Sequence, residues 1–201
     1  MIFTDTHTHL YSKEFDADRT LLIQKALDAG ITRLFMPNIS KESIEGMFEV
    51  EKQFPEFCFP MMGLHPCSVA DDVEDQLQVV EKWLEKRTFT GIGEIGIDLY
   101  WDKTFFKQQQ DAFRRQIQLT KKYALPYVIH SRNSFDETME IVSEFKNERI
   151  KAIFHCFSGN TQQAEQVIAA GDFKLGIGGV VTFKNSGLDK VVEAIDLKHM
   201  V

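Results

Sequence analysis

Short continuous apolar runs alternate along this chain with segments in which apolar residues recur every three or four positions. Residues 31–37 and 57–62 are continuous runs, whereas Leu22 and Ala26 recur at helical spacing in a segment that ends before Gly30. Continuous runs of this length are typical of strands buried on both faces, and the longer spacing is typical of amphipathic helices. The pattern therefore predicts strands that alternate with helices.

The same pattern continues to the end of the sequence. After the apolar opening at residues 1–3, it predicts strands at 31–37, 57–62, 90–94, 126–130, 151–155 and 174–177. It predicts helices at 21–27, 40–54, 73–86, 108–123, 135–145, 162–170 and 189–195.

Continuously apolar strands that are each followed by a helix imply a parallel sheet covered by helices, which is an α/β fold. About seven β/α units favour a (β/α)8 TIM-type barrel, truncated after about seven units, over a doubly wound sheet. We expect residues 1–201 to form a single barrel domain that lacks the eighth strand and final helix.

Charge restricts the partners that this chain can bind. The formal net charge is −7, and Lys and Arg form only pairs such as Arg114-Arg115 and Lys121-Lys122. A basic surface for nucleic acid is absent from the sequence as a whole, so any phosphate must be bound by a local cationic site.

Cysteine usage and hydropathy indicate the compartment. The three cysteines, Cys58, Cys67 and Cys156, form no Cys-x-x-Cys motif, and the N-terminus lacks the features of a signal peptide. No apolar run approaches the roughly 18 residues of a membrane span. We therefore expect a reduced, cytoplasmic protein with no membrane partner.

Two histidines lie two positions apart near the N-terminus, in the segment Thr4–Leu10. Residues i and i+2 of a strand point to the same face, so His7 and His9 are expected to project side by side. Two imidazoles in this arrangement can bind one divalent cation at roughly 2.0–2.1 Å per Zn–N bond. The pair is predicted to be one half of a metal site.

Other potential ligands follow the predicted strands as well. His65, His130, His155 and Glu94 all lie at or just beyond the end of one. In a barrel these ends share one face, where the β/α loops build the active site. The repeated placement indicates a metal centre rather than a set of unrelated histidines.

The number of candidate ligands indicates two ions. Four histidines and a carboxylate exceed the three protein ligands that one catalytic zinc usually takes. Glu94 is the candidate bridge between cations that lie about 3.5–4 Å apart in two-metal sites. Zinc, magnesium, manganese, nickel and iron are not distinguished by these donors.

A glycine pattern that could suggest a nucleotide cofactor is rejected. Residues 91–96 match G-x-G-x-x-G, but no helix opens directly after them. Glu94 would also place a negative charge where a pyrophosphate has to lie. No dinucleotide site is expected.

Five motifs in this order closely resemble the TatD family of metal-dependent deoxyribonucleases. They are His7-x-His9, Gly63-Leu64-His65-Pro66, Gly93-Glu94-Ile95-Gly96-Ile97-Asp98, His130-Ser131-Arg132 and His155-Cys156-Phe157-Ser158-Gly159. The resemblance runs from residue 1 to the end. It implies a metallo-dependent hydrolase barrel that acts on the phosphodiesters of DNA.

The resemblance also implies a role for each matching residue. His7 and His9 would bind one ion, and Glu94 would bind both. His130 and His155 would bind the second ion. His65 and Arg132 would face the scissile phosphate, so that Glu94, His65 and Arg132 form the expected catalytic set, with Asp98 in a supporting role.

The sequence departs from the family at its C-terminus. The family pattern has an eighth strand whose aspartate completes the first metal site, and residues 196–201 resemble only the approach to it. We expect an open seam between the seventh and first strands, which would expose a sheet edge.

The leading hypothesis is a two-metal hydrolase that cleaves DNA phosphodiesters, as an exonuclease or in single strands, because an acidic surface binds long duplex poorly. One alternative is an amidohydrolase-like enzyme acting on a cyclic amide or ester. By resemblance, that class commonly uses a carboxylated lysine as the bridge. The predicted fourth strand here has Glu94 and no lysine, which argues against this alternative. The other alternative is a non-catalytic protein that binds metal or a partner, because the expected aspartate is missing.

Overall fold

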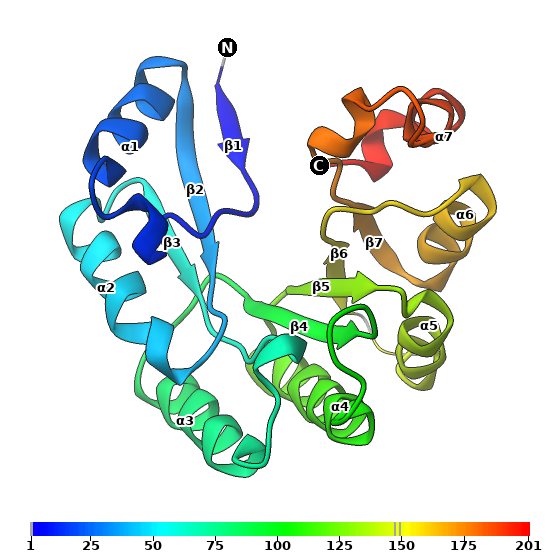
Figure 1. The fold of residues 1–201 in the computed structure, drawn as a ribbon, viewed down its shortest axis with the longest axis horizontal. Helices are drawn as coiled ribbons and strands as arrows, with labels where there is room; N and C mark the ends of the chain where they lie inside the picture. The colour runs from blue at the N-terminus through cyan, green and yellow to red at the C-terminus, as the bar shows by residue number, and fades with distance from the viewer. Residues whose placement is uncertain (1, 147, 149) are drawn as a thin grey trace.

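The computed structural model describes residues 2–146, 148 and 150–201, in which strands and helices alternate in chain order (Figure 1). The strands are β1 (Phe3–Asp5), β2 (Ile31–Pro37), β3 (Cys58–Met61), β4 (Ile92–Asp98), β5 (Tyr127–Arg132), β6 (Lys151–Phe154) and β7 (Asp172–Leu175). The α-helices are α1 (Arg19–Asp28), α2 (Ile44–Gln53), α3 (Val73–Lys86), α4 (Phe106–Tyr123), α5 (Phe135–Glu144), α6 (Thr161–Ala170) and α7 (Leu188–Ala194).

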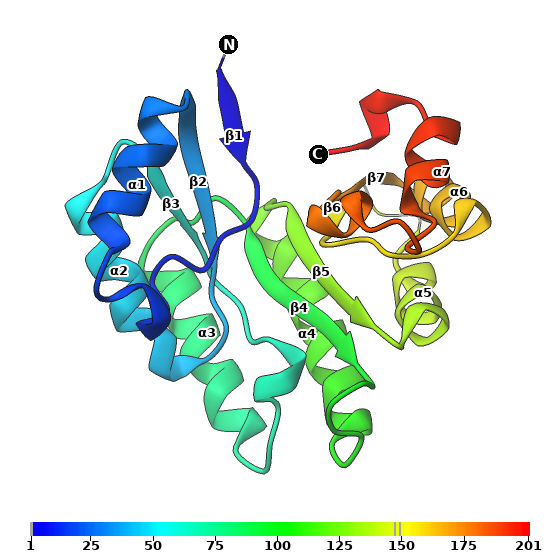
Figure 2. The same ribbon diagram turned by 45° about the horizontal axis from the view of Figure 1, so that its top comes forward.

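All neighbouring strands are parallel and lie in chain order. β1, β2 and β3 form one sheet, and β4, β5, β6 and β7 form another. A parallel bridge between Met62 and Ile92 joins the two sheets, so together they curve around a common interior with the helices outside (Figures 1 and 2). This arrangement confirms the predicted α/β fold of the TIM-barrel type. None of the helices in the described ranges is both long and apolar enough to cross a membrane.

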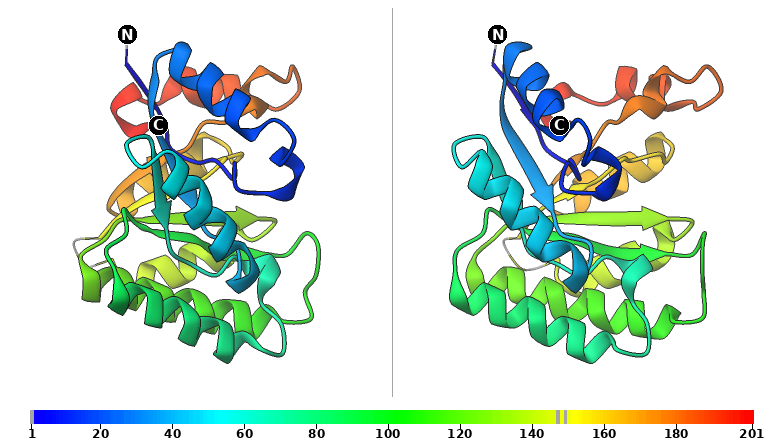
Figure 3. Two further views of the ribbon diagram at one scale, coloured as in Figure 1. Left: turned by 90° about the vertical axis from the view of Figure 1, so that its left-hand side faces the viewer. Right: turned by 60° about the vertical axis from the view of Figure 1, so that its left-hand side comes forward.

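The helices form because one face of each is apolar. In α3, Leu77, Val80 and Leu84 are buried at the spacing of successive helical turns. In α6, Asn160 and Gln163 form a capping box in which each side chain accepts a hydrogen bond from the backbone N–H of the other. Figure 3 shows α3 and α4 lying side by side beneath β4 and β5.

The first and last parts of the chain face each other across an opening in the barrel (Figure 1). Val201 continues the parallel pattern next to β7, because its N–H donates to Leu175 and its carbonyl accepts from Ile177, both at 2.9 Å. A pocket between β1 and this segment is lined by Phe3 and Ile31 on one side and Val201 on the other.

The prediction for β4 is wrong in its position. The strand was expected at residues 90–94 but spans Ile92–Asp98, and all seven of its residues are buried. Its polar end is accommodated inside because the Asp98 N–H donates to Gln109 Oε1 of α4 at 2.9 Å. Glu94 therefore lies within the strand, inside the barrel, instead of at the strand end.

Candidate metal centre

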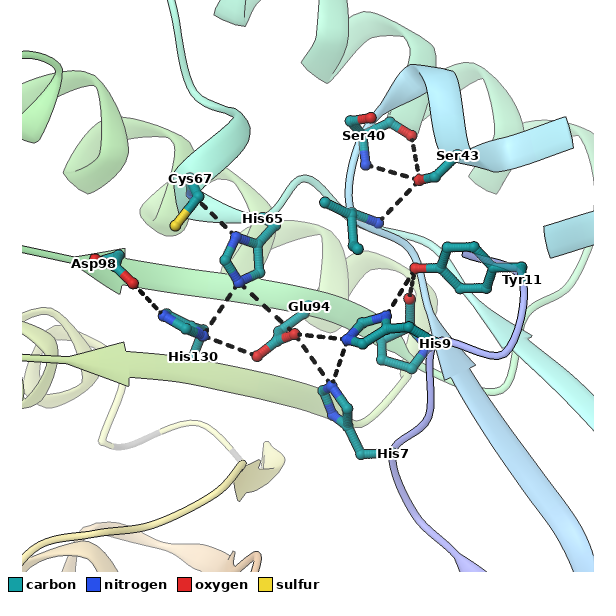
Figure 4. Close-up of polar contacts among 12 residues, drawn as sticks. His7, His9, Tyr11, Ser40, Ser43, His65, Cys67, Glu94, Asp98 and His130 are labelled. Carbon is teal, nitrogen blue, oxygen red and sulfur yellow. Dashed lines mark hydrogen bonds and ion pairs between the residues drawn. The ribbon is translucent and has the colours of Figure 1, made fainter. Parts of the chain in front are cut away.

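The carboxylate of Glu94 is the centre of a polar cluster in the barrel interior (Figure 4). The residue is only 2% exposed. Its Oε1 lies 3.1 Å from His130 Nδ1, and its Oε2 lies 3.1 Å from His7 Nε2, 3.4 Å from His9 Nε2 and 3.8 Å from His65 Nε2. Residues from β4, β5 and the segments after β1 and β3 thus meet at one side chain.

Burial by itself raises the pKa of Glu94, because a charged carboxylate loses its hydration. Hydrogen bonds from His130, His7 and His9 outweigh burial and lower the pKa well below its ordinary value. Glu94 is therefore an ionised carboxylate, which is the form that binds a cation.

His7 and His9 lie just beyond the end of β1, where the sequence predicts them. The backbone still continues the strand pattern there, since the Thr8 N–H donates to the carbonyl of Phe35 in β2 at 2.9 Å. The two imidazoles consequently converge, with 3.0 Å between their Nε2 atoms.

The hydrogen bonds of His9 determine which of its ring nitrogens has a free lone pair. The Tyr11 hydroxyl donates to the carbonyl of Pro37 at 2.5 Å, so it must accept from His9 Nδ1, which lies 2.9 Å away. A neutral imidazole with its hydrogen on Nδ1 has its lone pair on Nε2. That lone pair faces His7 and Glu94 (Figure 4). Tyr11 remains protonated, because burial and the charge of Glu94 raise its pKa.

A cation fits this arrangement better than protons do. Two histidine nitrogens and one carboxylate oxygen lie 3.0–3.4 Å apart, and one shared proton cannot satisfy all three. Two ligands about 2.0–2.1 Å from a tetrahedral cation lie roughly 3.3 Å apart, which matches these separations. Among the residues described, His7 Nδ1 is buried without a hydrogen-bond partner, so no hydrogen bond of Nδ1 fixes which ring nitrogen carries the hydrogen. The donor set therefore suits a divalent cation.

His130, the fourth residue of β5, lies between two carboxylates. Its Nδ1 faces Glu94, and its Nε2 lies 2.8 Å from Asp98 Oδ2. Burial lowers the pKa of His130, but hydrogen bonds to Glu94 and Asp98 outweigh burial and raise it. In the neutral imidazole that a cation needs, Asp98 holds the hydrogen on Nε2 and leaves the Nδ1 lone pair toward Glu94.

Asp98 also fixes the loop after β4. Its Oδ1 accepts from the backbone N–H groups of Tyr100 and Trp101, at 2.9 and 3.2 Å. One carboxylate thus connects a candidate ligand, His130, to the segment that follows the strand. The supporting role expected for Asp98 agrees with these contacts.

His65 differs from the other histidines in its hydrogen bonds. It caps the short 3₁₀ helix η3 (Pro66–Ser68), where its Nδ1 accepts from the Cys67 N–H at 3.0 Å. Its hydrogen is therefore on Nε2, directed toward Glu94 and His130. Burial lowers the pKa of His65 to about 4, so the ring is neutral near pH 7. Its contacts suit a hydrogen-bond donor more than a metal ligand.

The structure brings His155 and Arg132 to the same cavity without direct contact with Glu94. His155 follows β6, and its ring stacks on that of His7 with 3.3 Å between centroids. Burial, followed by the charge of His7, lowers the pKa of His155 to about 3. Arg132 ends β5 and lines this cavity together with His9, His65, Glu94, His130 and His155.

Two groups of side chains in the described residues could each hold an ion. One is His7, His9 and Glu94, and the other is His65, Cys67 and His130, with candidate ligand atoms within 4.8 Å of one another in each group. The second group was not predicted. Tyr11, the hydrogen-bond partner of His9, was not predicted either, although its i+2 spacing after His9 could have indicated it.

A parallel α/β barrel with histidines and a buried carboxylate gathered inside it defines a metal-dependent hydrolase. The chain belongs to the TatD related DNase family, which matches residues 4–201. It is a hydrolase that acts on ester bonds, as the nucleases of this family do.

Individual relatives agree with this placement. The chain is 32% identical over 192 residues to the uncharacterized metal-dependent hydrolase YabD of Bacillus subtilis, covering 96% of this chain and 74% of that protein. It is 26% identical to the 3'-5' ssDNA/RNA exonuclease TatD of Dickeya dadantii, covering 92% of this chain and 69% of that protein. The crystal structure of the TatD homologue YjjV from Escherichia coli superimposes with a TM-score of 0.89 at 28% identity, covering 99% of this chain and 77% of that one.

Proposed function

We propose that this protein hydrolyses phosphodiester bonds of single-stranded DNA, or of DNA ends, with two divalent cations bound on either side of Glu94. The observation that carries the proposal is the bridging position of this carboxylate. One of its oxygens faces His7 and His9, and the other faces His130. The relative from Dickeya dadantii, which is named a 3'-5' exonuclease of single-stranded DNA and RNA, supports the substrate class.

The residues divide into two ligand groups. His7, His9 and Glu94 Oε2 would bind one cation, and Glu94 Oε1, His130 and His155 would bind the other. Cations in such a site stabilise negative charge on a phosphate and make water more acidic. His65 Nε2 would donate a hydrogen bond to the phosphate, and Arg132 would add a positive charge at the opening of the cavity.

Replacing the bridge tests this proposal. In Glu94→Gln, the amide keeps the shape of the side chain but loses the negative charge. We expect hydrolysis of a single-stranded oligodeoxynucleotide to fall at least about a hundredfold and the metal content of the purified protein to decrease. Glu56→Gln is the matched control, because Glu56 is exposed and precedes β3, whereas His65 of the cluster follows that strand.

The outcomes separate the alternatives. Unchanged hydrolysis by Glu94→Gln would overturn the assignment of the bridge. Wild-type protein that binds metal but hydrolyses no ester or amide would favour a non-catalytic role. Hydrolysis of a cyclic amide, without any of the oligonucleotide, would favour an amidohydrolase-like activity.

A further inference from the structure

Two large aromatic side chains are exposed beside the candidate metal centre. Tyr100 and Trp101 are 51% and 68% exposed, in the loop between β4 and α4. Their ring centroids are 4.8 Å apart and the rings are nearly perpendicular, at 87°. Exposed aromatic rings next to a site that cleaves a ligand are candidates for contact with that ligand.

Arg132 connects these rings to the cavity. Its guanidinium carbon lies 3.9 Å from the Tyr100 ring centroid and 5.2 Å from that of Trp101. Arg132 is exposed and lines the cavity that contains Glu94. In the part of the chain that the structure describes, it makes no ion pair. Its positive charge is thus available to an anion in a protein whose net charge is −7.

The rings are not needed to hold the loop. The Leu99 N–H donates to the Arg132 carbonyl at 2.9 Å, and Asp98 accepts from the next two backbone N–H groups. Asp102 Oδ1 accepts from the Thr104 N–H at 2.8 Å. Because backbone hydrogen bonds already fix this loop, an exposed tryptophan contributes little to its stability. Contact with a ligand explains the exposure better than a structural role does.

We propose that Tyr100, Trp101 and Arg132 form a nucleobase-stacking platform next to the metal centre. This inference rests on the proposed function and adds to it the residues that bind the base. An unpaired base would stack on the ring of Trp101, while Arg132, stacked on Tyr100, would contact a phosphate of the same strand. A paired base within a duplex has no free face to offer, so the platform selects unpaired nucleotides.

The proposed platform predicts that the protein binds the bases of a strand and not only its sugar-phosphate backbone. The probe is a dye-labelled hexamer of deoxyadenylate with phosphorothioate linkages, and its control is a hexamer of abasic nucleotides with the same linkages. Stacking is worth about 1–3 kcal/mol per base, which corresponds to roughly 5- to 150-fold in affinity. In Trp101→Ala, the Kd for the adenylate hexamer should rise within this range. The Kd for the abasic hexamer should change less than about twofold.

Leu21→Ala serves as the matched control, because Leu21 is a large apolar side chain on α1 that is 55% exposed. It should leave both dissociation constants unchanged. A second readout uses a Trp83→Phe background, in which Trp101 is the remaining tryptophan. The adenylate hexamer should quench its fluorescence and the abasic hexamer should not.

The results distinguish failure of the platform from failure of the proposed function. If wild-type protein cleaves oligonucleotides with normal linkages but Trp101→Ala binds both hexamers like the wild type, the platform is wrong and the function stands. Equal weakening for both hexamers also overturns the platform, because the effect then does not depend on bases. Wild-type protein that neither binds nor cleaves oligonucleotides contradicts both.

Discussion

The two sides of Glu94 are built differently. His130 lies on β5, which pairs directly with β4, and Asp98 of the same β4 holds its other ring nitrogen. His7 and His9 instead follow β1, which belongs to the other sheet and is only three residues long. The His130 side is therefore positioned by two adjacent strands, whereas the His7 and His9 side reaches Glu94 across the barrel.

Backbone geometry strengthens this difference. Gly96 pairs with His130 and has φ of 142°, and a Cβ at this position would lie 2.0 Å from the His130 carbonyl oxygen. Glycine alone permits that close approach. The His7 ring is instead held by side chains, through its stacking on His155 and its contacts with Glu94 and His9. Its buried Nδ1 is without a hydrogen-bond partner among the described residues. We infer that a bound cation contributes more to the order of the His7 and His9 side than to the order of the His130 side.

The largest effect on this comparison is expected from His9→Ala. A structural four-ligand zinc site is worth about 10–16 kcal/mol, so one ligand contributes roughly 3 kcal/mol, or at least about a hundredfold in affinity. A calorimetric titration with zinc should resolve two affinities. In this variant one of them should fall by this factor, and the other should be retained. His199→Ala, which removes a histidine outside the cluster, should change neither. Loss of both affinities together would show that the two sides are not separable.

Asp98→Asn should affect the opposite side by a smaller amount. Partners that orient a metal-bound histidine typically contribute 10- to 100-fold to metal affinity. The asparagine oxygen can still accept hydrogen bonds from the backbone N–H groups of Tyr100 and Trp101. The NH2 group takes the place of Asp98 Oδ2 and cannot accept a hydrogen bond from His130 Nε2. A zinc titration should show weakening only of the His130 site. Asp102→Asn, in the same loop, is the control. Equal weakening of both sites would contradict the proposed division.

Tyr11→Phe is expected to have the smallest effect. The hydroxyl is a neutral partner of His9, so its loss should weaken the His7 and His9 site by about tenfold, the low end for such partners. The matched control is Tyr127→Phe, since the buried Tyr127 hydroxyl makes no hydrogen bond to any described residue. The same titration measures both variants. An unchanged affinity in Tyr11→Phe would mean that other contacts orient His9.

Much of the fold follows from local patterns. The predictions for β2 at residues 31–37 and α3 at 73–86 match the structure at both ends. Both segments have a clear apolar pattern, and the burial of their apolar side chains agrees with it. The predicted bounds of β4 begin and end too early in the chain, for two reasons. Gly93 and Gly96 interrupt its apolar pattern, and its polar end, Asp98, is buried by side chains that are distant in the sequence.

The candidate site also has features that the sequence predicts and features that it does not. The histidines that follow β1, β3 and β6 could be chosen from sequence, because parallel strands bring their ends to one face. His130 and Glu94 were expected at strand ends as well, but they lie within β5 and β4. The roles of those residues as ligands remain predictions. The stacking of His155 on His7, and the partner of His9, depend on side-chain positions that no spacing rule specifies.

The sequence by itself determined the succession of strands and helices and the residue types available for metal chemistry. Periodicity and motif spacing are local properties of the chain, so they can be read without coordinates. Only the tertiary structure decided that His9 turns its Nε2 lone pair inward, that His65 directs a hydrogen toward Glu94, and that Arg132 lies on exposed aromatic rings. These features depend on contacts between residues that are distant in the sequence or in loops, where the packing of the whole barrel sets the orientation.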